Sequence, residues 1–237
     1  MNRGPIIAID GPAGAGKSTV ARHVAQHFGL LYLETGAMYR AFALKAIVSD
    51  QDFEDAASLE RLARSTQITL EADRASNRVY LDGQDVTERI RDADVTQSAS
   101  RVSVHPGIRK WMVDLQRELG RKGGVVMEGR DIGTVVFPDA DVKFFLDASP
   151  EARSQRRYEQ NNSSAHANSA TAGDSDRSAV AQALRERDER DRNRANSPLR
   201  PAPDAIVIDS TSLTLDQVLT RIEDLVRPLF EKEKAAK

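Results

Sequence analysis

The chain contains no cysteine, which excludes disulfides, thiolate metal sites and cysteine nucleophiles. It also lacks a long apolar run. No stretch approaches the roughly 18 residues that a membrane helix needs, and the apolar stretch 5–9 stops at Asp10, too soon for a signal peptide. We therefore expect a cytoplasmic protein with no membrane partner.

An excess of positive charge is missing as well. Lys and Arg together number 34, Asp and Glu number 36, and the formal net charge is −2. A general nucleic-acid binder would show a strong basic excess, so we expect no nucleic-acid partner, although a local basic cleft stays open. A hydrophobic fraction of 40% with 30% charged residues is typical of a globular protein. The length of 237 residues predicts one large domain, or one domain that carries insertions.

Five short apolar segments have the length and β-branched content of buried strands. They are 6–10, 30–33, 125–127, 142–146 and 205–208. Helix-capable sequence separates them, including Lys17–Phe28, which Gly29 is suited to end, and Ala37–Ile47. This alternation predicts an α/β protein, a three-layer fold in which helices cover both faces of a five-stranded parallel sheet.

Two regions interrupt the alternation. Residues 67–88 contain two strand-like runs, Gln67–Glu71 and Arg78–Leu81, and the following Asp82-Gly83 is typical of a tight turn. We expect a small antiparallel sheet inserted there. Residues 160–179 are almost all small and polar, and we expect them to form a mobile surface segment because they offer too little apolar surface to pack.

A glycine-rich segment between the first predicted strand and the first predicted helix fits the phosphate-loop pattern G-x-x-x-x-G-K-[ST]. It reads Gly11-Pro12-Ala13-Gly14-Ala15-Gly16-Lys17-Ser18. The glycines allow a tight turn whose N–H groups point at phosphate oxygens, and the helix that follows adds its positive dipole end. Lys17 suits the β- and γ-phosphates, and the Ser18 hydroxyl suits Mg²⁺. This context favours nucleotide binding over a strand–helix connection without a ligand.

A phosphate loop alone does not separate kinases from GTPase switches and motor ATPases. A GTPase would need a guanine-reading N-K-x-D segment, which the sequence does not contain, and motors are usually longer. The remaining signals concern a second substrate, and they come from arginines.

Arginines follow two of the predicted strands. Arg40 comes shortly after the second strand and Arg130 directly after the third, and ligands of parallel sheets gather at the carboxyl ends of strands. Arg109 stands near a predicted helix start. For a single arginine, a solvated surface charge is the better interpretation. Convergence at strand ends favours anion binding for Arg40 and Arg130, because a guanidinium matches phosphate oxygens in a bidentate way.

Two further arginine groups flank the polar segment 160–179. Arg153, Arg156 and Arg157 precede it, and the segment 185–194 after it is dense in both signs of charge. As a helix, the latter would place Arg187, Arg190, Asp191 and Arg194 on one face. A solvated helix laced with salt bridges is the simpler alternative. Two arginine-bearing helices joined by a flexible loop would form a lid that closes over phosphates and excludes water.

This combination resembles the bacterial cytidylate kinases, nucleoside monophosphate kinases of the P-loop class. The segments that carry the resemblance are Ile9–Thr19, Glu34–Arg40, Glu128–Pro138 and Arg187–Arg194, and the similarity runs from about Ile6 to Leu229. The resemblance implies transfer of the γ-phosphoryl group of ATP to CMP or dCMP with Mg²⁺. It also implies a P-loop fold whose monophosphate-binding region carries an extra small sheet, together with a mobile lid.

The resemblance also implies which residues form the site. For ATP they are Gly11, Pro12, Ala13, Gly14, Ala15, Gly16, Lys17, Ser18 and Thr19, with Ser18 on Mg²⁺. For CMP they are Thr35, Arg40, Ser100, Arg109, Arg130, Asp131, Arg187, Asp191 and Arg194. The residues expected to be catalytic are Lys17, Arg130 and Arg187, and the lid residues are Arg153 and Arg157.

Within that set, the matched positions divide the roles. Ser100, Arg109 and Asp131 match positions that contact the base, and Asp191 matches the position at the sugar hydroxyls. The family positions that bind phosphate correspond to Arg40 and Arg130. The arginines around the monophosphate and the base correspond to Arg187 and Arg194. The position beside the incoming nucleotide corresponds to Thr35. A carboxylate that accepts from the cytosine amino group would meet the uracil carbonyl unfavourably, so Asp131 is expected to favour CMP over UMP.

We expect one domain, with a core formed by 1–35, 110–152 and 186–230, a monophosphate-binding insertion at about 36–109 and a lid at about 153–185. No long apolar face demands a partner, which favours a monomer. The alternatives are a related small kinase, of the UMP/CMP or the shikimate or gluconate type, and a nucleotide-dependent switch or RNA-binding regulator without catalysis. The base-reading residues and the inserted sheet argue against the first, and the net charge argues against the second.

Overall fold

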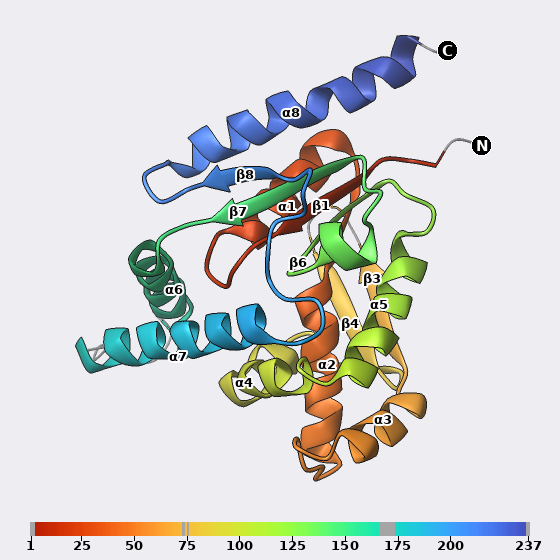
Figure 1. Cartoon of the computed structure of the whole chain (residues 1–237), viewed down its shortest axis with the longest axis vertical. Coiled ribbons are helices and arrows are strands. Elements are labelled where there is room, and N and C mark those ends of the chain that lie inside the picture. The colour runs from red at the N-terminus through yellow and green to blue at the C-terminus, as the bar shows by residue number, and fades with distance from the viewer. Residues whose placement is uncertain (1–2, 73, 75, 166–173, 236–237) are drawn as a thin grey trace.

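The computed structural model describes residues 3–72, 74, 76–165 and 174–235. Its main sheet has five parallel strands, as predicted (Figure 1), and the structure gives their order as β2-β6-β1-β7-β8. The strands are β1 (Ile6–Asp10), β2 (Leu31–Glu34), β6 (Val125–Gly129), β7 (Val142–Asp147) and β8 (Ile206–Asp209). Asp10 pairs with Gly129 and Glu34 with Glu128, so the carboxyl ends of β1, β2 and β6 form one edge.

Helices cover both faces of this sheet, which confirms the three layers (Figure 1). Successive strand residues point to opposite faces, so Ile7 and Ile9 pack under α1 (Lys17–Phe28) and α8 (Leu215–Ala235). Ile6 and Ala8 pack on the other face, against the cluster that contains α2 (Thr35–Val48) and α5 (Pro106–Gly120). All of β1 is buried, and each fully buried isoleucine contributes roughly 1.5–3 kcal/mol of hydrophobic stabilisation.

The start and end of α1 follow directly from glycines. Gly16 precedes the helix with φ 94° and Gly29 ends it with φ 71°, and its N–H donates to the Ala25 carbonyl. These left-handed conformations are accessible to glycine without strain. The predicted bounds Lys17–Phe28 are therefore those of the structure.

The chain between β2 and β6 contains the segment of about 36–109 that is expected to be an insertion, together with the rest of α5. Its helices are α2, α3 (Ala56–Arg64), a 3₁₀ turn at Arg89–Arg91, α4 (Ala93–Val102) and α5. The expected antiparallel sheet consists of β3 (Ile68–Ala72), β4 (Asn77–Leu81) and β5 (Gln84–Asp85).

Two local features fix that small sheet. Asp82 and Gly83 both have positive φ, 49° and 82°, as a tight hairpin turn requires. The Asn77 side chain joins the sheet to β2: its amide donates to the Tyr32 carbonyl at 2.6 Å and its oxygen accepts from the Glu34 N–H at 2.8 Å. The insertion is thereby held beside the carboxyl end of β2.

The predicted lid consists of two helices that pack on each other, α6 (Pro150–Ala165) and α7 (Asp174–Asn193) (Figure 1). The segment 160–179, expected to be a mobile surface segment, is helical over 160–165 and 174–179, and 166–173 lie outside the described residues. A π-helical turn, Ile132–Val136, follows β6. Among the described residues, no helix has the length and apolar character to cross a membrane.

Candidate active site

The phosphate loop lies between β1 and α1, and its shape depends on glycine. Gly11, Gly14 and Gly16 have φ values of 149°, 78° and 94°. A Cβ on Gly11 would stand 2.0 Å from the carbonyl oxygen of Leu146, so the loop can pass β7 only without a side chain at that position. The first residues of α1 then present their free N–H groups at the end of the loop.

Lys17 is buried in this loop, with 5% of its surface exposed. Its ammonium donates to the Pro12 carbonyl at 2.7 Å. Burial and, after it, the charge of Arg130 lower the pKa of Lys17 to about 7, and the charge of Glu128 opposes the change. A positive group held in a poorly solvated place is stabilised by the phosphates of a bound nucleotide.

Asp10, at the end of β1, was not singled out from the sequence. Its two carboxylate oxygens accept from the N–H groups of Ile132 and Gly133 at 2.8 and 2.7 Å. Burial raises the pKa of Asp10 to about 6, and the two backbone hydrogen bonds act in the opposite direction. This side chain fixes the turn after β6 against the phosphate loop strand. A charged residue that closes an apolar strand was the sequence signal that could have found it.

A second cluster of predicted residues surrounds a small cavity of about 50 Å³ beside the carboxyl ends of β2 and β6. Its lining comprises Thr35, Gly36, Tyr39, Ala99, Ser100, Ser103, Arg109, Gly129, Arg130, Asp131, Arg187, Asp191 and Arg194. We call this cavity the acceptor pocket. It brings together every residue that the sequence assigned to CMP except Arg40. The space holds a water molecule or two, so a nucleotide can enter only when side chains move apart.

One end of the acceptor pocket is formed by the Arg109–Asp131 pair. Both residues are buried, with exposures of 3% and 5%, and the Arg109 guanidinium donates to the Asp131 carboxylate. The Ser100 hydroxyl is buried and has no hydrogen-bond partner among the described residues. Donors and an acceptor therefore line the same wall, as recognition of a polar base edge requires.

Tyr39 also lies at this end, and it was not among the residues predicted from the sequence. The Arg109 guanidinium sits 5.7 Å from its ring centroid, and its buried hydroxyl has no partner within the described part of the chain. Burial raises the pKa of Tyr39 to about 12, so the hydroxyl is a neutral donor. Its position inside the Glu34–Arg40 motif was the available signal.

Asp191 links arginines at the other end of the pocket. Its carboxylate accepts from Arg130 Nε at 2.9 Å and lies 3.6 Å from Arg194. Burial would raise the pKa of Asp191, but the charges of Arg130, Arg187 and Arg194 lower it. Arg194 ends the helical face that the sequence predicted, and α7 itself ends one residue before it. The expected face of α7 thus points into the site rather than into solvent.

Positive charge exceeds negative charge at this end. Burial lowers the pKa of Arg187 to about 10, and the charges of Arg130, Arg40 and Arg157 add to the effect, while Asp191 opposes it. The pKa of Arg157 is lowered by burial and by Arg40. Such a concentration of partly buried guanidinium groups is stable when an anion joins it. We call Arg40, Arg130, Arg157 and Arg187 the arginine cluster.

Arg40 stands apart from the pocket lining. It donates to Glu34 Oε1 at 2.5 Å, and this ion pair is mostly buried, with side-chain exposures of 15% and 17%. Arg40 acts on Arg157 and Arg187 through its charge. Thr35, nearby, uses its hydroxyl to donate to the Glu128 carbonyl at 2.7 Å, which holds the start of α2 on β6.

The two predicted lid arginines have different surroundings although they lie one turn apart on α6. Arg153 is buried and saturated: it donates to the carbonyls of Ala148 and Ala13, both at 3.0 Å, and pairs with Asp188 at 2.6 Å. It therefore connects α6, α7 and the phosphate loop. Arg157 belongs to the arginine cluster, on the side where phosphate would bind.

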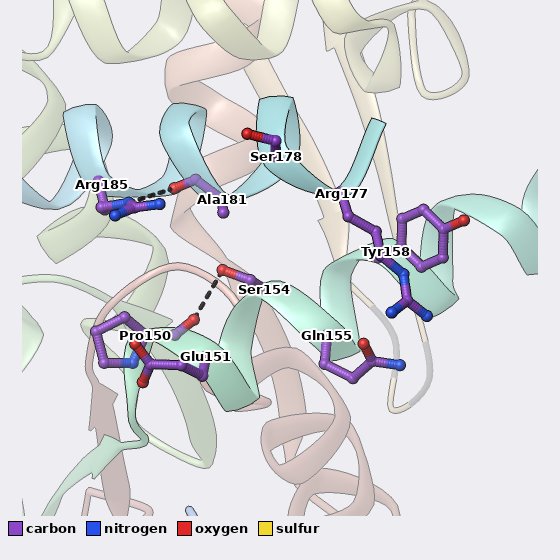
Figure 2. A pocket seen from close by; sticks show the side chains of 9 residues that line it. All are labelled: Pro150, Glu151, Ser154, Gln155, Tyr158, Arg177, Ser178, Ala181 and Arg185. Carbon is purple, nitrogen blue, oxygen red and sulfur yellow. Dashed lines mark hydrogen bonds between the residues drawn. The ribbon is translucent and has the colours of Figure 1, made fainter. Parts of the chain in front are cut away.

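A larger cavity, of about 290 Å³, lies between α6 and α7 (Figure 2). Arg177 covers the ring of Tyr158 at 4.6 Å, and Figure 2 shows the two side chains together at one end of the cavity. None of the described residues that line it belongs to the predicted nucleotide site. The acceptor pocket, although smaller, is lined by buried charged residues, and two of its arginines, Arg130 and Arg187, act electrostatically on Lys17 of the phosphate loop.

The family model described as "Cytidylate kinase" matches residues 7–228. A cytidylate kinase from Pelotomaculum thermopropionicum is 49% identical over 94% of this chain and 96% of the relative, and one from Solibacter usitatus is 47% identical over 94% and 92%. A solved structure of an uncharacterized protein from Eubacterium ventriosum has a TM-score of 0.50 at 12% identity over 94% of this chain and 98% of the other. That last likeness concerns the fold alone.

Proposed function

The chain belongs to the cytidylate kinase family, and from that premise we propose how its site transfers the γ-phosphoryl group of ATP to CMP or dCMP. The enzyme phosphorylates CMP at the expense of ATP. The observation that carries the assignment of residues is the position of Arg130 and Arg187, which line the same pocket as the base-recognition wall and act electrostatically on Lys17. Family membership favours this function over a shikimate- or gluconate-type kinase and over a switch without catalysis.

ATP binds in this proposal to the phosphate loop, from Gly11 to Thr19. The loop N–H groups and the dipole of α1 hold the β-phosphate, and the Lys17 ammonium exchanges its Pro12 contact for phosphate oxygens. Because the site lowers the pKa of Lys17 to about 7, the added negative charge also restores its proton at neutral pH.

The residues fit a divalent cation of the Mg²⁺ class. Ser18, half-buried in the first turn of α1, offers a hard oxygen donor beside the loop, and both oxygens of the neighbouring Asp10 are already engaged by backbone N–H groups. When bound with ATP, Mg²⁺ supplies charge neutralisation for the phosphate oxygens. Ser18 is the residue that we propose holds it.

CMP occupies the acceptor pocket in this proposal. Asp131 accepts from the cytosine amino group, while Ser100 and Arg109 donate to the ring nitrogen and carbonyl. Asp191 receives the sugar hydroxyls, and Arg194 lies between the base and the phosphate end. Entry requires the existing ion pairs to open, so these carboxylates and guanidiniums exchange protein partners for substrate partners at little net loss of hydrogen bonds.

The reaction needs little covalent chemistry from the protein. An oxygen of the CMP phosphate attacks the γ-phosphorus of ATP, a new P–O bond forms, and the bond to the bridging β,γ-oxygen breaks with its electrons staying on ADP. No general base is required, because the second ionisation of a phosphate monoester, near pH 6, leaves the nucleophile largely ionised. Lys17, Arg130 and Arg187 stabilise the charge on the transferred group, and Thr35 and Arg40 help to place the acceptor.

The lid in this proposal is the α6–α7 pair within about 153–185. Arg153 anchors the pair to the phosphate loop through Ala13, and Arg157 approaches the phosphates when the site closes. The core comprises 1–35, 110–152 and 186–230, and the insertion 36–109 binds the monophosphate. We propose a monomer, since the exposed large apolar side chains come from several separate elements.

A coupled assay that detects ADP tests the function across CMP, dCMP, UMP and AMP. We expect CMP and dCMP to give the highest kcat/KM. A higher value for UMP or AMP would contradict the proposed base recognition. Tight RNA binding at physiological salt without turnover of any nucleotide would contradict catalysis itself.

A further inference from the structure

Two of the four histidines of the chain face α8 from the last turns of α1. His23 and His27 are four residues apart, so they lie one above the other on the same face of the helix. Glu223, on α8, approaches both from the opposite side. Neither nucleotide binding nor phosphoryl transfer, as described above, uses these three residues.

The donor atoms of the three side chains already converge. His23 Nε2 lies 2.5 Å and His27 Nδ1 3.5 Å from Glu223 Oε1, and one donor atom from each residue lies within 4.8 Å of the others. The helices that carry them are fixed relative to each other, since Phe28 stacks on Phe230 at 4.8 Å between ring centroids. The cluster therefore joins two rigid elements.

We propose that His23, His27 and Glu223 form a binding site for a divalent transition-metal ion of the Zn²⁺ class. Two imidazoles and one carboxylate are a donor set that such ions prefer, whereas Mg²⁺ and Ca²⁺ favour oxygen ligands. Three protein ligands leave the fourth tetrahedral position to water.

The geometry requires only small movements. Zn²⁺ bonds to nitrogen and oxygen are about 2.0–2.2 Å, so tetrahedral donor atoms stand roughly 3.3–3.5 Å apart. His27 Nδ1 is already 3.5 Å from the carboxylate, and the His23 hydrogen bond lengthens when the ion replaces its proton. The histidine side chains are 37% and 39% exposed and Glu223 is 19% exposed, so an ion can enter from solvent.

A hydrogen-bonded pair alone does not account for the arrangement. The His23–Glu223 hydrogen bond would form without His27. The Nδ1 atom of His27 is 3.5 Å from the carboxylate, which is too far for a good hydrogen bond. Arg227, which lies 3.9 Å from Asp224, adds positive charge near Glu223. This charge lowers the affinity of the site for a cation but does not change the positions of the three donor atoms.

The ion would connect the middle and end of α1 to α8. Because the phosphate loop lies at the opposite end of α1, we expect an effect on stability and not on the transfer reaction itself. A ligand at 100 times its dissociation constant shifts the folding equilibrium about 100-fold, which for a chain of this size raises Tm by roughly 5–10 °C.

The test compares the intact chain with His27→Gln, using Zn²⁺ as the probe at pH 7.5 without nucleotide. His27→Gln keeps the His23–Glu223 hydrogen bond and removes one ligand. We expect Zn²⁺ to raise the Tm of the intact chain by several degrees, and titration calorimetry to show one site per chain. In His27→Gln the affinity should fall at least tenfold, which at the same Zn²⁺ concentration reduces the Tm shift to about half or less.

Two controls make the outcome decisive. Asp224→Asn removes a neighbouring carboxylate from the same helix and should leave Zn²⁺ binding unchanged, and Mg²⁺ should not replace Zn²⁺ in protecting the intact chain. Kinase activity measured without Zn²⁺ shows that each variant is folded. An equal Tm shift in the intact chain and in His27→Gln, or no shift in either, would overturn the proposal while leaving the assignment of the kinase site unaffected.

Discussion

In the proposed function, the phosphate loop and the acceptor pocket would bind phosphate in two different ways. The loop is eight consecutive residues whose glycines have positive φ, and its donors are backbone N–H groups and one lysine. The pocket takes its lining from five separate stretches of the chain, and its donors and acceptors are side chains held in buried ion pairs. The phosphate loop therefore depends on the shape of its backbone, whereas the acceptor pocket depends on how charged side chains are distributed around it.

This difference predicts how each region responds to change. The loop has little room: a Cβ on Gly11 would meet the Leu146 carbonyl. The pocket holds more positive charge than it neutralises, so removing a guanidinium relieves an unfavourable interaction while it removes a phosphate ligand. Loop variants should thus lose ATP chemistry alone, and pocket variants that lose a guanidinium should lose activity without losing stability.

Lys17→Met should have the largest effect. It keeps an unbranched, flexible side chain that is one atom shorter, but it removes the charge that we place on the β- and γ-phosphates. We expect kcat to fall about 10³-fold in steady-state assays, the loss typical of a preorganised charged donor. The affinity for CMP, measured by calorimetry without ATP, should stay within about twofold. A parallel fall in CMP affinity would mean that the two regions do not act separately.

Arg187→Ala should come next, at about 100-fold in kcat/KM for CMP, because the other members of the arginine cluster share its work. The free energy of unfolding should stay equal or rise, since the pKa of Arg187 is lowered to about 10 by burial and like charge. Urea denaturation measures this. Arg185→Ala, an exposed position on the same helix, is the matched control and should alter neither quantity. Marked destabilisation by Arg187→Ala would contradict the excess of charge.

The same contrast explains what could be predicted from the sequence. The five strands, the small sheet, the bounds of α1 and the phosphate loop all followed from patterns within short segments: apolar runs, turn residues and glycine spacing. The edge of the sheet where ligands gather also followed, because parallel strands place their carboxyl ends together. Local chemistry was sufficient for these features.

The functional state of individual charged residues could not be predicted in this way. Arg153 and Arg157 look equivalent in sequence, yet one is saturated by Ala13, Ala148 and Asp188 and the other remains in the arginine cluster. The burial of Tyr39 also depends on contacts between distant segments. Family resemblance supplied the membership of the pocket, and the geometry distinguished the structural residues from those available to substrate.

Asp131→Asn tests selectivity, with a smaller expected effect. The amide still accepts from cytosine through its oxygen but can also donate to the uracil carbonyl, so the ratio of kcat/KM for CMP to that for UMP should fall about tenfold. Part of the stability should be lost, because Arg109 loses its buried counter-charge. Asp188→Asn, which disturbs a buried pair with Arg153 outside the pocket, should lose stability and keep selectivity. An unchanged ratio in Asp131→Asn would refute its role in reading the base.

Tyr39→Phe should have the smallest effect and gives the finest test of the comparison. The buried hydroxyl has no partner in the described chain, so its removal should leave the free energy of unfolding unchanged or slightly higher. If the hydroxyl is reserved for the acceptor, KM for CMP should rise about fivefold, the value of one hydrogen bond of roughly 1 kcal/mol, while KM for ATP stays constant. Tyr80→Phe, whose exposed hydroxyl donates to Glu71 in the small sheet at 3.0 Å, should change neither constant. An unchanged KM for CMP in Tyr39→Phe would mean that the Tyr39 hydroxyl makes no hydrogen bond with the bound substrate. The side chains of the acceptor pocket would then be less completely matched to their ligand than the backbone of the phosphate loop is.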